Sequence, residues 1–220
     1  MRLTIISTPI GFLGSGRGGG VELTLNSLVS GLLKQNHKIN VVAPINSRLS
    51  ESCKSANLFT VEGVEQRSWQ HLDYYTKTKF SDDSIINLML EKALSFINNC
   101  DAIINLSYDF LPISRTLELN FPILHLISMG DESLEINNIV SKVYSNFPYN
   151  FAFHSRAQAS DYPFIKEPII LGNGFELSQY TFQEKNDGPL AWVGRVSPEK
   201  GLEDAVYVAN EIGEILNVWG

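Results

Sequence analysis

The chain has 220 residues, of which 44% are hydrophobic and 19% charged, and its formal net charge is −7 at pH 7. This length is more than one typical domain needs and less than two full domains need, and the hydrophobic fraction is sufficient for a sizeable core. No basic run offsets the negative charge, which argues against a nucleic-acid backbone as partner.

The cysteines and the apolar runs indicate where the protein resides. Cys53 and Cys100 lie far apart and have no metal-type spacing, so we expect free thiols in a reducing compartment. No apolar run approaches the roughly 18 residues that a membrane-spanning helix needs, and the apolar stretch at the start is too short for a signal peptide. We therefore expect a cytoplasmic protein without a stable membrane anchor.

Strands and helices are predicted to alternate along the chain. Strands are expected over 3–7, 39–43, 58–61, 102–106, 122–127, 151–153 and 169–171, and helices over 21–33, 85–97, 111–119 and 132–145. This order is typical of an α/β fold with a doubly wound, parallel, Rossmann-like sheet, in which ligands gather beyond the carboxyl ends of the strands.

A glycine-rich segment joins the first predicted strand to the first predicted helix. Its glycines are Gly14, Gly16, Gly18, Gly19 and Gly20. Backbone N–H groups in such a loop approach an anion closely, and the following helix presents its positive end to that anion. The segment therefore predicts a phosphate site, with a flexible surface loop as the alternative.

The spacing Gly14-x-Gly16-x-x-Gly19 also matches the dinucleotide fingerprint. Two details count against NAD: about six residues separate the first glycine from the strand, and no acidic residue stands near the end of the second strand. A dehydrogenase or epimerase is therefore the weakest alternative. No Gly-Lys-Ser/Thr follows, which excludes a phosphate-loop NTPase.

The end of the chain begins a second βαβ unit. The polar run 184–188 is typical of a linker, and it is followed by a predicted strand over 190–193, a helix over 202–212 and a strand over 215–219. We expect an N-terminal domain over 1–183 and, over 189–220, the incomplete start of a second Rossmann-like domain, so that this chain would be inactive alone.

Two basic residues stand at the start of the helix of this second unit. Ser197 and Pro198 have the pattern of an N-cap followed by proline at the first helical position, which places Lys200 in the first turn and Arg195 just before it. A cation at a helix N-terminus is locally unfavourable. Lys200 therefore suggests a bound anion, although a solvated lysine beside Glu199 or Glu203 is equally consistent.

Two polar residues in the middle of the chain have structural alternatives. His125 lies inside a predicted buried strand, where a hydrogen-bonded core histidine is expected. Asp109 follows a strand and is either a site contact or the N-cap of the next helix. No Asp-x-Asp motif occurs, so the metal–diphosphate clamp of some sugar transferases is not available and no metal is expected.

Several of these segments together resemble the GT-B fold, family 4 glycosyltransferases. They are Gly18-Gly19-Gly20-Val21-Glu22, the Gly-Asn-Gly turn at 172–174 and the run GRVSPEKG at 194–201. Within that family, FLGSGRGGGVELT at 12–24, Tyr108-Asp109 and HLISMG at 125–130 are similar to UDP-glucose:tetrahydrobiopterin glucosyltransferases. The histidine that many members place just past this strand is absent, since the strand ends in Ser128.

The resemblance implies a retaining, metal-independent transfer of glucose from UDP-glucose to a small acceptor such as tetrahydrobiopterin. It implies two groups of site residues and no cofactor besides the donor substrate. The donor diphosphate would be bound by Gly19, Gly20, Arg195 and Lys200, and the acceptor by Tyr108, Asp109, Ser128 and Met129. A non-catalytic α/β module that binds a phosphorylated ligand is the main alternative.

Overall fold

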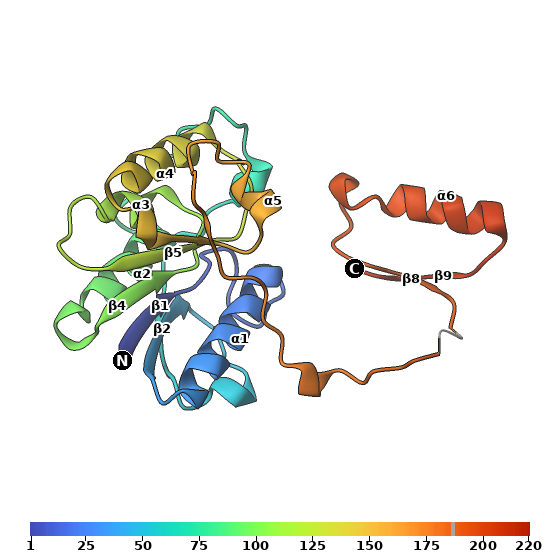
Figure 1. The fold of residues 1–220 in the computed structure, drawn as a ribbon, viewed down its shortest axis with the longest axis horizontal. Coiled ribbons are helices and arrows are strands. Elements are labelled where there is room, and N and C mark those ends of the chain that lie inside the picture. The colour runs from blue at the N-terminus through green and yellow to red at the C-terminus, as the bar shows by residue number, and fades with distance from the viewer. Residues whose placement is uncertain (186–187) are drawn as a thin grey trace. The chain divides into compact units, whose positions relative to one another are not determined.

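A computed structural model describes residues 1–185 and 188–220 of the chain. The chain divides into two compact units, Met1–Glu176 and Leu177–Gly220 (Figure 1). The linker expected at 184–188 falls in the second unit, and its residues 186 and 187 lie outside the described residues.

The first unit contains one parallel sheet with the strand order β3-β2-β1-β4-β5-β6-β7. Its strands are β1 (Arg2–Ile6), β2 (Lys38–Pro44), β3 (Asn57–Val61), β4 (Ala102–Asn105), β5 (Ile123–Ile127), β6 (Phe151–Phe153) and β7 (Ile169–Ile170). The chain winds outward from β1 to β3 and then, from β4 to β7, in the opposite direction. The prediction of a doubly wound, Rossmann-like α/β sheet is confirmed.

Helices cover both faces of this sheet. They are α1 (Gly20–Lys34), α2 (Ile85–Leu94), α3 (Phe110–Arg115), α4 (Leu134–Asn146) and the short α5 (Arg156–Ala159). Successive strand residues point to opposite faces: Ile5 packs in one core cluster with Leu25 of α1, and Ile6 packs in another with Met89 of α2. Figure 1 shows α1 and α4 on opposite sides of the sheet.

Two helices are shorter than the sequence predicts. Helix α2 ends at Leu94, and the Oγ of Ser95 then donates a hydrogen bond to the carbonyl oxygen of Lys92 at 2.7 Å. Helix α3 ends at Arg115, and Thr116 turns its hydroxyl toward His125. In both cases a polar side chain at the end of the helix bonds to a neighbouring group, which favours termination over continuation of the helix.

The second unit consists of β8 (Leu190–Val193), α6 (Leu202–Ile212) and β9 (Leu216–Trp219). Strands β8 and β9 pair in parallel, from Leu190 opposite Leu216 to Val193 opposite Trp219. The predicted βαβ unit is therefore present, as a sheet of two strands. No helix within residues 1–185 and 188–220 is both long enough and apolar enough to span a membrane.

Candidate ligand-binding site

The strand order reverses between β1 and β4, and the candidate site lies at the carboxyl ends of these two strands. The glycine-rich loop follows β1, which ends at Ile6, and Tyr108 and Asp109 follow β4, which ends at Asn105. In open α/β sheets, ligands bind outside the carboxyl ends of the strands at such a reversal. Because all the strands are parallel, Ser128 and Met129 after β5 lie on the same edge.

A buried hydrogen-bond network joins the ends of β4 and β5. The Nδ2 group of Asn105 donates to the backbone oxygen of Ser107 at 2.9 Å and to Nδ1 of His125 at 3.1 Å. The His125 Nε2–H then donates to Oγ1 of Thr116 at 2.8 Å. Burial lowers the pKa of His125 to about 3, so the ring is neutral. His125 is the hydrogen-bonded core residue that the sequence predicts.

The glycine-rich loop has a defined conformation that is anchored to the segment after β2. The backbone N–H of Leu13 donates to Oγ of Ser47 at 2.9 Å, and the N–H of Arg48 donates to the Leu13 oxygen at 3.0 Å. Gly14 and Gly19 have φ values of 95° and 58°, a region that favours glycine. The loop therefore has a defined turn conformation that is anchored at Leu13.

Glu22, in the first turn of α1, fills the inside of this loop. Its side chain accepts hydrogen bonds from the N–H of Gly14 (2.7 Å), the N–H of Gly18 (2.8 Å) and the hydroxyl of Ser15 (3.4 Å), and the residue is 8% exposed. A Cβ at Gly18 would lie 2.8 Å from Thr8 Cγ2, so a larger residue there would force a neighbouring side chain to shift.

Sequence reasoning did not identify this role of Glu22. The available signal was an acidic residue in the first turn of the helix that follows the loop, a position where the helix dipole favours a negative charge.

Gly19 and Gly20, the predicted diphosphate contacts, differ in how their N–H groups are used. The N–H of Gly19 donates to the backbone oxygen of Gly16 at 3.1 Å. Within residues 1–185 and 188–220, the N–H of Gly20 has no hydrogen-bond acceptor. Gly20 begins α1, and both glycines are exposed. The Gly20 N–H is therefore the better placed of the two for an anion, and the diphosphate role of both stays a prediction.

Asp109, a predicted acceptor contact, is completely buried. Its Oδ1 accepts from the N–H of Leu111 at 3.4 Å, which makes it the N-cap of α3. Its Oδ2 accepts from Nε2 of Gln66 and from Nε1 of Trp69. Burial raises the pKa of Asp109 to about 6. The alternative role as an N-cap is therefore confirmed, and Gln66 and Trp69 separate its carboxyl from solvent.

The other predicted acceptor residues differ in exposure. Tyr108 is 7% exposed, and its hydroxyl accepts from the N–H of Glu132 at 3.3 Å and from the hydroxyl of Tyr162 at 3.4 Å. Burial raises the pKa of Tyr108 to about 12. Ser128 and Met129 are half-buried. Of the four residues, only Ser128 and Met129 therefore present substantial surface at the carboxyl edge.

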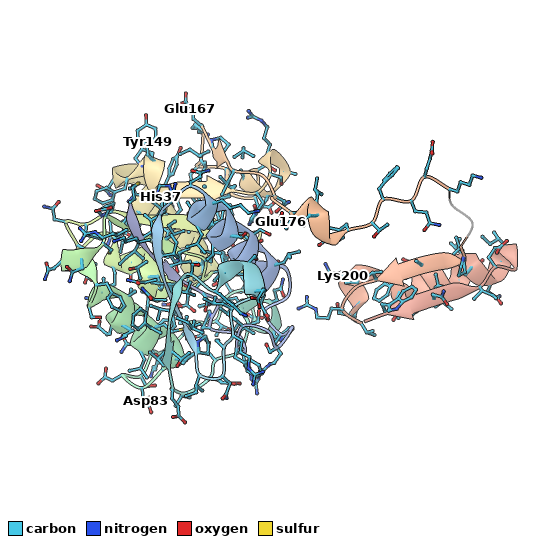
Figure 2. All side chains as sticks on the ribbon, turned by 90° about the horizontal axis from the view of Figure 1, so that it is seen from below. His37, Asp83, Tyr149, Glu167, Glu176 and Lys200 are labelled. Atoms are coloured by element: carbon cyan, nitrogen blue, oxygen red, sulfur yellow. The ribbon has the colours of Figure 1, made fainter. Side chains whose placement is uncertain are left out.

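In the second unit, Arg195 and Lys200 follow β8 and are both exposed; Figure 2 shows Lys200 at one end of this unit. The prediction that Lys200 lies in the first turn of α6 is wrong. Residues Pro198–Lys200 form a separate 3₁₀ turn. Gly201, with a φ of 62°, separates this turn from α6. Ser197 is the N-cap of this turn, without a side-chain cap bond among the described residues, and its Oγ donates to the Arg195 oxygen at 3.4 Å.

A cavity of about 420 Å³ lies along α1. Its far wall is the segment 171–176, so that Gly172 and Gly174 of the predicted Gly-Asn-Gly turn line it, and Nδ1 of His154 lies 3.1 Å from the Gly172 oxygen. None of the predicted donor or acceptor residues of the first unit lines this cavity. Among the residues that the structure describes, no group of three His, Cys, Asp or Glu could hold a metal ion.

Comparisons with known proteins do not assign a family. No family model matches the chain, and no curated protein matches it. Among solved structures, the chain is similar to one titled "putative Mar1 ribonuclease from Leishmania major". That match has 10% identity and a TM-score of 0.37, and it covers 76% of this chain and 93% of the other. A match at this level carries no argument about function.

These findings overturn the expected membership in the GT-B fold, family 4 glycosyltransferases and the closer resemblance to tetrahydrobiopterin glucosyltransferases. No family model and no curated protein places the chain among glycosyltransferases, and the solved structure named above is titled a putative ribonuclease. The family prediction, and with it the GT-B designation of the first domain, is wrong. It rested on short glycine-rich and basic segments, and such segments recur in unrelated α/β proteins because the same backbone geometry serves many anions. What the fold defines is a Rossmann-like α/β protein.

Proposed function

We propose that the first unit binds a phosphorylated ligand of the nucleotide type at the carboxyl edge between β1 and β4. The single observation that carries this proposal is the coincidence of three features at one point: the reversal of strand order, an anchored glycine-rich loop and the start of the 15-residue helix α1. The N-terminus of a helix attracts a phosphate through its unpaired N–H groups and its dipole. The exposed start of α1 at Gly20 would meet that phosphate.

We propose further that the ligand is UDP-glucose and that the reaction is a metal-independent transfer of glucose to a small acceptor. The departing diphosphate gains negative charge, which fixed cations stabilise. Arg195 and Lys200, both exposed in the second unit, would supply these cations. The features that support it are, each within its own unit, the glycine-rich loop of the first unit, which is suited to an anion, and the two exposed cations of the second unit.

The main alternative is a non-catalytic module that binds a phosphorylated ligand in the first unit alone. The finding that favours it is the burial of Tyr108 and Asp109, which leaves few polar groups at the edge for an acceptor. We also propose that the protein works in the cytoplasm, where its two buried, unpaired cysteines would stay reduced.

Calorimetric titration at low ionic strength tests these proposals. The ligands are UDP, UDP-glucose and NAD, and the proteins are the wild-type chain, Arg195→Ala, Lys200→Ala and, as a control, the exposed Lys38→Ala. We expect UDP and UDP-glucose to bind, and Arg195→Ala and Lys200→Ala each to weaken binding by about tenfold, as expected for a charge-assisted contact. Binding of UDP that is unchanged by both substitutions supports the module, and binding of NAD without binding of UDP contradicts the UDP-glucose proposal.

A transfer assay separates the enzyme from the binding module. UDP-glucose labelled in the sugar is incubated with the chain, with and without small hydroxyl-bearing acceptors, and UDP release is followed. The enzyme predicts UDP release that depends on the acceptor. Tight binding of UDP-glucose without UDP release under any condition contradicts glucose transfer by this chain.

A further inference from the structure

The carboxylate of Glu22 occupies a position where an anion-binding loop would otherwise hold a ligand. Its Oε2 lies 2.7 Å from the N of Gly14 and its Oε1 lies 2.8 Å from the N of Gly18. Both bonds have the short length of charge-assisted hydrogen bonds. The inside of the glycine-rich loop is therefore filled by an anion that belongs to the protein.

The loop itself supplies the groups that hold this carboxylate. Arg17, the basic residue within the loop, points its guanidinium to Glu65 instead, with Nη1 3.2 Å from Oε2. A buried carboxylate is costly unless hydrogen bonds replace its water. Here the replacements are two backbone N–H groups and the Ser15 hydroxyl, and the first turn of α1 adds a favourable dipole. The bonds thus link residues 14–18 of the loop to the start of α1.

Three N–H groups of the loop glycines are already used within the protein. The N–H groups of Gly14 and Gly18 are used by Glu22, and that of Gly19 is used by the Gly16 oxygen. The N–H of Gly20, at the start of α1, has no acceptor within the described part of the chain. Glu22 therefore both orders the loop and excludes a second anion from its inside.

We propose that Glu22 is a positioning residue for the ligand: it fixes the glycine-rich loop so that a phosphate meets the start of α1 and not the inside of the loop. Glu22 acts through the loop and does not touch the reacting atoms. The proposal rests on the proposed binding of a phosphorylated ligand, and its test must therefore separate the order of the loop from the affinity for that ligand.

The test uses the full 220-residue chain as wild type, Glu22→Ala and Glu22→Gln, with Glu62→Ala as a control at an exposed glutamate. The first measurement is amide hydrogen exchange at Gly14 and Gly18 by NMR. We expect exchange at both amides to accelerate about tenfold or more in Glu22→Ala, since each loses a charge-assisted bond. Acetate should restore protection in Glu22→Ala by entering the vacated position, and Glu22→Gln should show an intermediate rate.

The second measurement is the affinity for UDP in the same variants. We expect the Kd to rise about tenfold in Glu22→Ala, to recover partly with acetate and to stay unchanged in Glu62→Ala. Rescue by acetate distinguishes a role of the carboxylate in the loop from a general loss of folding. Circular dichroism of Glu22→Gln, which keeps the side-chain length, checks that the fold persists.

Two results would overturn the proposal. One is unchanged exchange at Gly14 and Gly18 in Glu22→Ala, which would show that the carboxylate does not order the loop. The other is unchanged affinity for UDP although protection is lost, which would show that loop order does not serve the ligand. Failure of the wild-type chain to bind UDP overturns the proposed function instead, and the exchange rates then still decide whether Glu22 orders the loop.

Discussion

Asp109 should make the folded chain less stable as the pH rises from 4 to 7. Its carboxyl is completely buried, and burial raises its pKa to about 6, whereas an aspartate in an unfolded chain titrates near ~3.9. The folded state therefore holds the proton more tightly, so stability is greatest below the unfolded pKa and is lost as the pH rises through the folded pKa. The full effect is about 3 kcal/mol, of which about 2 kcal/mol develops between pH 4 and pH 7.

The assay compares urea unfolding of the wild-type chain and Asp109→Asn at a series of pH values. Asparagine keeps an oxygen for the N-cap bond to Leu111 and does not titrate. Of the three tryptophans, Trp69 contacts Asp109, so replacing Trp192 and Trp219 by Phe makes fluorescence report on the first unit. We expect the free energy of unfolding of the wild type, relative to the variant, to be about 2 kcal/mol more favourable at pH 4 than at pH 7.

The wild type must be compared with Asp109→Asn because His125 changes the free energy of unfolding in the opposite direction over the same pH range. Its contribution cancels when wild type and variant are subtracted. Below pH 4, Asp101→Asn is a control of opposite sign, since the backbone N–H of Arg2 donates to Asp101 at 2.7 Å and lowers the pKa of that carboxyl, so the stability it contributes is lost as the pH falls. A difference between wild type and Asp109→Asn that stays constant from pH 4 to pH 7 would refute the reasoning.

Two further predictions concern the glycine-rich loop and the core histidine. Gly18→Ala should cost about 1 to 3 kcal/mol, because its Cβ would lie 2.8 Å from Thr8 Cγ2 and 2.9 Å from Glu22 Cγ. In Gly20→Ala the new Cβ meets nothing within 4 Å, so the free energy of unfolding should stay the same or rise by up to ~1 kcal/mol. Equal unfolding midpoints for Gly18→Ala and Gly20→Ala would contradict these expectations. The pKa of His125 is lowered to about 3 by burial, so the wild type should lose about 3 kcal/mol between pH 7 and pH 4 through this group. His125→Gln should therefore lose less of its free energy of unfolding between pH 7 and pH 4 than the wild type does. An equal loss in the two proteins would contradict that expectation.

Most of the fold could be predicted because buried parallel strands are short apolar runs. The runs at 39–43 and 102–106 give β2 and β4 to within one residue at each end, and α6 has the predicted bounds of 202 and 212. The helix α5 was missed because it has four residues, too few for a periodic pattern. Lys200 was placed in α6 because Gly201 was not recognised as a residue with positive φ that separates the turn from the helix.

The position of the candidate site could be predicted, but its internal contacts could not. Tyr108 and Met129 lie on one edge of the sheet because the preceding strands are parallel, and this position does not depend on their side-chain contacts. The burial of Asp109 depends on Gln66 and Trp69, which lie 43 and 40 residues earlier in the chain. These two residues belong to a polar, aperiodic segment that gives no signal of where it packs. The closure of the loop by Glu22 likewise depends on backbone geometry, which the sequence does not show.

The most direct test of the proposed ligand site is a titration of the ¹⁵N-labelled chain with UDP, followed at each backbone amide by NMR. A phosphate at the start of α1 predicts a saturable shift of the Gly20 and Val21 amides, with the amide of Gly63 unchanged as a reference. The amides of Gly14 and Gly18 should stay protected, because Glu22 keeps their hydrogen bonds. Saturable binding of UDP that leaves Gly20 and Val21 unshifted, or no binding at millimolar UDP, would contradict the account.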